Sequence, residues 1–184
     1  VGNPTADEVR NFRASYTESR QDFGIRHQLD DRPIIALLAG SRRQEVKDNL
    51  PAMIEAASAF KDKYQLVLAK APSLDDDYYA PFLKGKDIKA VSDKTYALLS
   101  HSTAALVTSG TATLETALFG VPQTVCYKTP VPRLIRFAFN HIIKVDYISL
   151  VNLIANREVV PELLADRFTV YNIANELYNI LRSE

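Results

Sequence analysis

The fold follows from residues 34–45, which read IIALLAGSRRQE. The unbroken apolar run Ile34–Leu38 predicts a strand buried on both faces of a sheet, and Gly40 marks its end. Apolar residues then recur at the spacing of a helix, at Val46, Leu50, Met53, Ile54, Ala57 and Phe60. We expect Pro51 to separate a first turn from the main helix, because proline cannot donate a helical hydrogen bond. A buried strand that leads into a helix is the repeating unit of a parallel α/β sheet.

The same alternation continues along the chain. Further strands are predicted at residues 64–69, 88–91, 104–108 and 123–127. Helices are predicted at residues 75–83, 94–101, 110–119, 132–143 and 169–181, with Gly120 as a C-terminal cap. We therefore expect one α/β domain over residues 33–184, a parallel sheet covered by helices on both faces. Residues 1–32 are polar and predict a linker with a short helix.

Composition excludes some classes of function. The 184 residues carry 22 Lys and Arg against 22 Asp and Glu, so no overall field attracts nucleic acid, and we expect no nucleic-acid partner. No apolar run reaches the roughly 18 residues of a spanning helix, and no signal peptide is evident. The lone Cys126 rules out an internal disulfide and fits a reducing compartment, so we expect a cytoplasmic protein. The start at Val1 suggests a piece of a longer chain.

The first candidate binding loop is Gly40-Ser41-Arg42, directly after the first strand. Ligands of parallel sheets bind outside the carboxyl ends of the strands. Gly40 lets a ligand approach the backbone, Ser41 offers a hydroxyl, and the helix start that follows favours an anion. Arg42 adds a planar cation suited to phosphate oxygens. The loop alone equally fits a capped turn with solvated arginines.

The second candidate loop is Ser109-Gly110-Thr111, directly after the fourth strand. Small and hydroxyl residues again open a helix, which favours an anion. Glu115 follows on the first turns of this helix, where it either interacts with the helix dipole or accepts hydrogen bonds from ribose hydroxyls. Two phosphate-binding loops on one edge, together with one acid at ribose distance, predict a nucleoside diphosphate site.

Other reactive residues predict no second site. His27, His101 and His141 lack the spacing of metal ligands, so we expect no metal site. No nucleophile elbow is present, which argues against a hydrolase triad. Cys126 lies within a predicted strand and is expected to be a small buried hydrophobe.

The helix predicted at residues 132–144 is unusually basic on one side, through Arg133, Arg136, Asn140, His141 and Lys144. One interpretation is a helix packed on the sheet with a solvated basic face. The other is a surface that contacts anionic lipid or a lipid-like substrate, and hence a peripheral association with the inner membrane.

Three segments together resemble the lipid-A-disaccharide synthases. They are Gly40-Ser41-Arg42 with Glu45, Ser109-Gly110-Thr111 with Glu115, and residues 146–155, which read DYISLVNLIA. The third segment continues through Arg157-Glu158 and residues 160–164, VPELL. The first two segments recur among glycosyltransferases with two Rossmann-like domains, whereas the third is the discriminating one. The family more often has His at the position of Asn3.

The resemblance implies a fold and a reaction. The chain would be the C-terminal, Rossmann-like domain of a GT-B type inverting glycosyltransferase that uses neither metal nor cofactor. Such an enzyme transfers 2,3-diacylglucosamine from UDP to 2,3-diacylglucosamine 1-phosphate and releases UDP. By matching motif, Arg42 would contact the diphosphate and stabilise the leaving group, and Ser109, Gly110 and Thr111 would cradle the phosphates. Glu115 would hold the ribose, and Asn152 would line the cleft.

No residue here is a convincing general base, so we expect the base to come from an N-terminal domain. The chain alone is then expected to bind UDP without turnover. Three alternatives stay open: another transferase or epimerase that uses UDP-N-acetylglucosamine, a non-catalytic nucleotide-binding module, and a structural half-domain that folds only with its partner.

Overall fold

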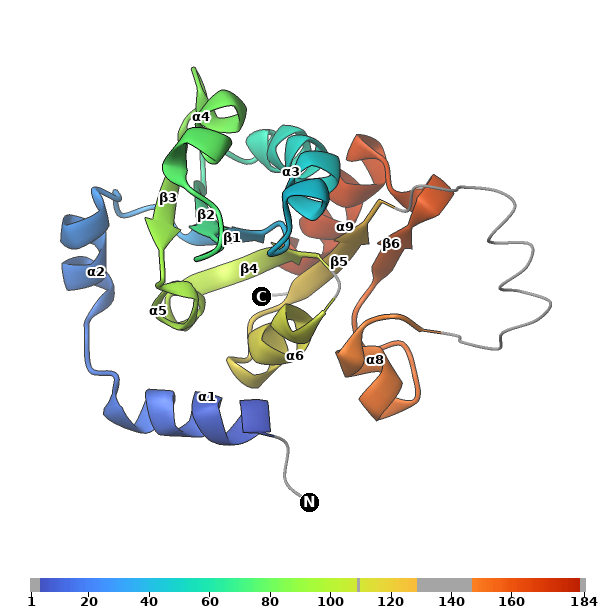
Figure 1. Ribbon diagram of the computed structural model, residues 1–184, viewed down its shortest axis with the longest axis horizontal. Coiled ribbons are helices and arrows are strands. Elements are labelled where there is room, and N and C mark those ends of the chain that lie inside the picture. The colour runs from blue at the N-terminus through green and yellow to red at the C-terminus, as the bar shows by residue number, and fades with distance from the viewer. Residues whose placement is uncertain (1–3, 109, 129–146, 183–184) are drawn as a thin grey trace.

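The computed structural model describes residues 4–108, 110–128 and 147–182. Its centre is a six-stranded sheet in the order β3-β2-β1-β4-β5-β6, and all five neighbouring pairs are parallel (Figure 1). The strands are β1 (Ile34–Leu38), β2 (Gln65–Lys70), β3 (Ile88–Ser92), β4 (Ser102–Val107), β5 (Gln123–Tyr127) and β6 (Glu162–Leu164). The strand order reverses direction at β1, with β2 on one side and β4 on the other. Parallel sheets bind ligands at such a switch point.

Helices cover both faces of this sheet. They are α1 (Pro4–Ser15), α2 (Arg20–His27), α3 (Arg43–Ser58), α4 (Asp76–Leu83), α5 (Thr95–Ser100), α6 (Thr111–Leu118), α8 (Leu150–Ala155) and α9 (Val170–Arg182). One face packs against α3, α4 and α9, and the other against α2 and α5, with α1 and α6 at its edge. The predicted α/β sheet covered on both faces is therefore confirmed.

Strand β1 lies at the centre of both cores, as its unbroken apolar run predicts. Ile35 and Leu37 face α3 and α9, whereas Ile34, Ala36 and Leu38 face the opposite helices. The four residues from Ile34 to Leu37 are fully buried. Successive side chains of a strand point to opposite faces, so only a continuous apolar run serves a sheet with two covered faces.

The expected break at Pro51 is wrong, because α3 runs without interruption from Arg43 to Ser58. Leu50, Met53 and Ile54 around the proline are almost completely buried against the sheet. Burial of such side chains contributes about 1.5–3 kcal/mol each, which offsets the roughly 3 kcal/mol that a proline costs within a helix.

Residues 4–27 form two helices where the sequence predicted a single short one. Ser19 caps α2, because its Oγ accepts a hydrogen bond from the Asp22 amide at 3.0 Å. Val9 of α1 and Phe23 of α2 are buried. Each helix has only a narrow apolar side, so the helical periodicity was weak in this polar stretch.

Strand β6 and helix α8 were not predicted as elements. Strand β6 is three residues long, with Leu163 opposite Cys126 of β5, and α8 is six residues long. Neither is long enough to show a period. The predicted helix at residues 132–143 lies outside the described residues.

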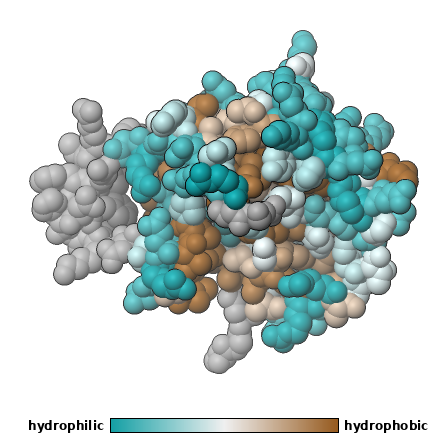
Figure 2. All heavy atoms as spheres, turned by 180° about the vertical axis from the view of Figure 1, so that it is seen from behind, coloured by the Kyte–Doolittle hydropathy of each residue, from teal (hydrophilic) through white to brown (hydrophobic). Residues whose placement is uncertain are grey.

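The face of the molecule opposite to that of Figure 1 is mixed in character, and Figure 2 shows apolar atoms near its middle with hydrophilic atoms around them. Over the whole described surface, the large apolar or aromatic side chains that stay exposed are Ile25, Leu153, Ile154, Val159, Tyr171 and Tyr178. In the described part of the chain, no helix has the length and apolarity needed to cross a membrane.

Candidate functional site

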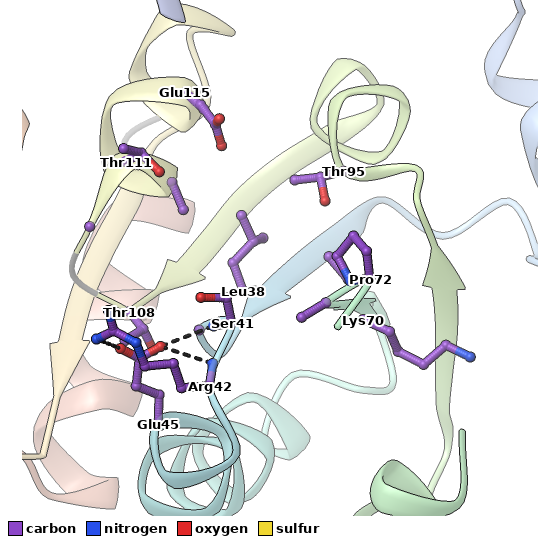
Figure 3. A pocket seen from close by; sticks show the side chains of 15 residues that line it. Leu38, Ser41, Arg42, Glu45, Lys70, Pro72, Thr95, Thr108, Thr111 and Glu115 are labelled. Carbon is purple, nitrogen blue, oxygen red and sulfur yellow. Dashed lines mark hydrogen bonds and ion pairs between the residues drawn. The ribbon is translucent and has the colours of Figure 1, made fainter. Parts of the chain in front are cut away.

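A cavity of about 360 Å³ opens at the carboxyl ends of β1 and β4, between the starts of α3 and α6 (Figure 3). Both candidate loops line it, together with residues that follow β2 and β3. The lining residues are Leu38, Gly40, Ser41, Arg42, Glu45, Ala69, Lys70, Ala71, Pro72, Thr95, Thr108, Gly110, Thr111, Ala112 and Glu115. This volume lies within the range of small-molecule sites. The structure thus brings the described residues of the two predicted loops into one cavity.

Gly40 holds the first loop in a conformation that other residues rarely adopt, with φ at +102°. A Cβ atom on this residue would lie 2.5 Å from Oε2 and 2.7 Å from Cβ of Glu45. Both the backbone angle and the close approach therefore require glycine.

Glu45 caps the start of α3, a role that the sequence did not predict. Its Oε2 accepts hydrogen bonds from the amides of Ser41 at 3.0 Å and Arg42 at 3.3 Å. The chain's own carboxylate therefore engages the amides of the two residues that precede α3 (Figure 3). A carboxylate here is favourable for the same reason that a phosphate would be, namely the partial positive charge of a helix N-terminus.

Arg42 remains available to a ligand. Its guanidinium Nη1 lies 3.4 Å from Glu45 Oε1, yet its side chain is 83% exposed. Exposed ion pairs of this kind contribute at most about 1 kcal/mol, so the guanidinium can turn to a phosphate at little cost.

Among the described residues, no side chain caps the start of α6. Gly110 is its N-cap residue, with φ at +136° and no side chain to accept the first amides. Thr111, next in the chain, is exposed and lines the cavity. Uncapped amides at a helix N-terminus favour an anion. Ser109, the other predicted member of this loop, lies outside the described residues.

Glu115 lies on α6 at the edge of the cavity and is partly buried (Figure 3). Its Oε1 accepts a hydrogen bond from the Tyr96 hydroxyl at 3.1 Å. Burial raises the pKa of the Glu115 carboxyl, the Tyr96 hydrogen bond lowers it, and the negative charge of Glu8 raises it. A partly desolvated acceptor at a cavity edge is suited to ligand hydroxyl groups.

The cavity also has lining residues after β2 and β3, which the sequence did not single out. Lys70 ends β2 and lines the cavity with Pro72, and Thr95 begins α5. Thr108 follows β4, and its buried Oγ1 has no hydrogen-bond partner among the described residues. Only the topology identifies these positions, because Lys, Pro and Thr have no pattern that distinguishes a cavity wall from a surface loop.

Asn152 is not among the residues that line this cavity, and its expected place in the cleft of the whole protein stays a prediction. The residue is fully buried. Its Nδ2 donates to Val160 O at 2.8 Å and to Glu162 Oε1 at 2.9 Å, and its Oδ1 accepts from the amides of Val159 and Val160. Because its amide oxygen and nitrogen are both engaged within the fold, Asn152 connects α8 to the segment that leads into β6.

The other reactive side chains in the described part of the chain pack within the fold. In the described ranges, no cluster of three His, Cys, Asp or Glu residues is placed to hold a metal ion. His27 and His101 both contact the ring of the buried Phe23, and burial lowers the pKa of each imidazole. Cys126 is fully buried, as predicted, and burial raises the pKa of its thiol.

The fold is shared with enzymes that act on nucleotide sugars. ADP-heptose heptosyltransferase II of Escherichia coli aligns with a TM-score of 0.57 at 13% identity, covering 100% of this chain and 53% of that one. A UDP-GlcNAc 2-epimerase from Methanocaldococcus jannaschii aligns with a TM-score of 0.61 at 14% identity, covering 96% and 46%. These likenesses define the class: the chain has the Rossmann-like half of the GT-B fold.

Sequence comparison identifies the family within this class. The lipid-A-disaccharide synthetase family matches residues 1–184, and the chain belongs to it. The lipid-A-disaccharide synthase of Geobacter sulfurreducens is 36% identical over 182 residues, which cover 96% of this chain and 46% of that protein. The chain thus spans about half the length of such relatives. The resemblance drawn from the three sequence segments is confirmed.

Proposed function

We propose that this chain is the donor-binding half of a lipid-A-disaccharide synthase, and that its cavity holds the UDP part of UDP-2,3-diacylglucosamine. The observation that carries the proposal is that Arg42, Glu115 and the start of α6, which no described side chain caps, all meet at one cavity. Family membership supplies the reaction, in which the diacylglucosamine unit passes to 2,3-diacylglucosamine 1-phosphate and UDP departs.

The groups that line the cavity suit the two parts of UDP, the diphosphate and the ribose. Arg42 and the α6 start, with Gly110 and Thr111, offer positive charge to the diphosphate, and Ser109 belongs to the same loop by motif. Glu115 accepts hydrogen bonds from the ribose hydroxyls. As the bond to the sugar breaks, negative charge grows on the departing diphosphate, and Arg42 and the α6 dipole stabilise it where it develops.

The catalytic base is proposed to belong to the other half of the protein. Glu115 and Glu45 are the carboxylates that line the described cavity, and each has another role here. We propose that residues 1–32 connect to that preceding domain and that residues 33–184 form the donor-binding unit. Contact of residues 132–144 with membrane lipid remains a prediction, because this segment lies outside the described residues.

Calorimetric titration of this chain with UDP, UMP and uridine tests the proposal. We expect UDP to bind more tightly than UMP, and Arg42→Ala to reduce this preference. Glu115→Ala is expected to weaken UDP binding by about 10- to 100-fold, since hydrogen bonds to charged groups contribute about 1.5–3 kcal/mol. Arg167→Ala is the control, because Arg167 does not line the cavity.

Two results would contradict the proposal. Absence of UDP binding at millimolar concentration would remove the nucleotide site. Equal affinity of wild type and Glu115→Ala would remove the ribose assignment. With the other half of the protein present, the acylated donor should be used and UDP-N-acetylglucosamine should not; the reverse preference would favour another transferase or an epimerase.

A further inference from the structure

Tyr96 is the residue that touches Glu115 from outside the predicted motifs. It lies on α5, next to Thr95, which lines the cavity. Its hydroxyl donates a hydrogen bond to Glu115 Oε1 at 3.1 Å. This bond engages one carboxylate oxygen and so restricts the rotation of a side chain that otherwise has three rotatable bonds. Among the described residues, no hydrogen bond engages the other oxygen, Oε2, which leaves Oε2 for a ligand.

An aromatic cluster holds Tyr96 in place. The Tyr96 ring meets Phe12 of α1 edge-on at 5.4 Å between centroids and lies 5.4 Å from the ring of Phe119. Phe12 and Phe119 also contact each other, at 6.0 Å. Rings in such edge-to-face contacts contribute about 0.5–1.5 kcal/mol per pair beyond their burial. The Tyr96 side chain is therefore fixed by α1 and by the residue that ends α6.

Helix α1 is attached to α6 by a second contact. Arg13 Nη1 donates to Leu118 O at 3.0 Å, at the end of α6. Glu8, one turn before Phe12, lies close enough to Tyr96 and Glu115 for its charge to act on both. The helix that precedes the sheet is thus built against the acid end of the cavity.

We propose that Tyr96 is a positioning residue, which aims the Glu115 carboxylate at the ribose hydroxyls of the bound nucleotide, and that α1 fixes Tyr96 through Phe12. This inference rests on the proposed function, because it assumes that Glu115 receives the ribose. It adds a determinant of ribose recognition that neither of the binding loops contains. It also makes α1 a part of the donor site.

The chain offers a matched control for the tyrosine hydroxyl. Tyr16 also stacks on Phe12, at 4.7 Å, and its hydroxyl also donates to a glutamate, Glu18 Oε2, at 2.9 Å. Neither Tyr16 nor Glu18 lines the cavity. Tyr96→Phe and Tyr16→Phe therefore remove the same group from the same aromatic cluster, and only the first removes it from Glu115.

The test compares the affinities for UDP and 2′-deoxy-UDP in this chain, measured by calorimetry. Their ratio reports recognition of the 2′-hydroxyl, and a general loss of stability leaves it unchanged. We expect Tyr96→Phe to reduce the ratio at least threefold and Tyr16→Phe to leave it at the wild-type value. Glu115→Gln should reduce the ratio further, and the double variant Tyr96→Phe/Glu115→Gln should match Glu115→Gln alone.

The possible failures are distinguishable. If the wild-type chain does not bind UDP, the proposed function is overturned, and this inference is overturned with it. If the wild-type chain binds UDP and Glu115→Gln keeps the wild-type ratio of UDP to 2′-deoxy-UDP affinity, the ribose assignment is overturned. A ratio that falls in Glu115→Gln but not in Tyr96→Phe overturns the inference alone, as does an equal fall in Tyr16→Phe.

Discussion

At the residue scale, the two carboxylates that line the cavity, Glu45 and Glu115, have different hydrogen-bond partners. Glu45 binds the chain's own amides at the start of α3, whereas Glu115 accepts the Tyr96 hydroxyl through one oxygen and is proposed to offer the other to a ligand. The sequence predicted a site at both loops because small and hydroxyl residues precede each helix. It did not predict that Glu45 would cap the first loop, because a capping carboxylate and a solvated one share the same sequence position.

Gly40 provides a stability prediction at this scale. Gly40→Ala combines a backbone strain with a clash against Glu45, so we expect the free energy of unfolding to fall by about 2–3 kcal/mol. Gly85→Ala is the control, since Gly85 also has a positive φ, at +71°, but an added Cβ would meet nothing within 4 Å. Urea denaturation measures both. Equal losses in the two variants would show that the contact with Glu45 contributes nothing.

Glu115 provides a pH prediction. A protonated carboxyl is a poorer acceptor for ribose hydroxyls, so the UDP to 2′-deoxy-UDP affinity ratio should fall as the pH is lowered. Burial and the charge of Glu8 raise the pKa of Glu115, while Tyr96 lowers it. We therefore expect the fall at a higher pH than for an ordinary glutamate.

Two variants check that Glu115 causes the pH dependence. For each, the affinities for UDP and 2′-deoxy-UDP are measured by calorimetry at several pH values. Glu8→Gln removes a like charge and should move the midpoint to lower pH. Glu115→Gln should give a ratio that does not change with pH. The titration of the phosphates cancels in the ratio, and a pH-dependent ratio in Glu115→Gln would assign the effect to another group.

At the element scale, the sequence predicted β1 to β5 and most of the helices between them. Long apolar runs and clear helical spacing specify such elements, because each must bury a whole face. Shorter elements are specified by tertiary contacts. Helix α8 begins directly after its N-cap residue Ser149, which is held by the buried Glu162 of β6: Glu162 accepts the Ser149 amide at 2.9 Å and its hydroxyl at 2.6 Å.

Asn152 belongs to this element-scale network, and its substitution should affect stability. Asn152→Ala would leave the Glu162 carboxylate and the amides of Val159 and Val160 with fewer partners in a buried place. We expect a loss of about 2–4 kcal/mol in the free energy of unfolding. Asn172→Ala, which removes one exposed hydrogen bond to Arg167 O, should cost less than 1 kcal/mol.

The same pair of variants tests whether Asn152 has a structural role or a role in binding. Folded Asn152→Ala protein should bind UDP with wild-type affinity, as measured at a temperature well below its melting point. A tenfold loss of affinity in this folded variant, with an unchanged Asn172→Ala, would return Asn152 to the binding cleft.

At the scale of the whole molecule, the position of the site follows from the topology. Strands β1 and β4 are adjacent and parallel, so loops some seventy residues apart in sequence meet at one edge. The sequence predicted this meeting from the rule that ligands of parallel sheets bind outside the carboxyl ends of the strands. It did not identify the far wall, where Lys70, Pro72 and Thr95 contribute, since those positions depend on how β2, β3 and α5 pack.

The most direct test of the central claim is a map of backbone amide chemical shifts during a titration of this chain with UDP. The account predicts the largest changes at residues 40–42, 95–96 and 110–115, around the cavity at the ends of β1 and β4. It would be contradicted by changes confined to the separate depression between the ends of α3 and α9, near Phe60 and Tyr178, or by no change at millimolar UDP.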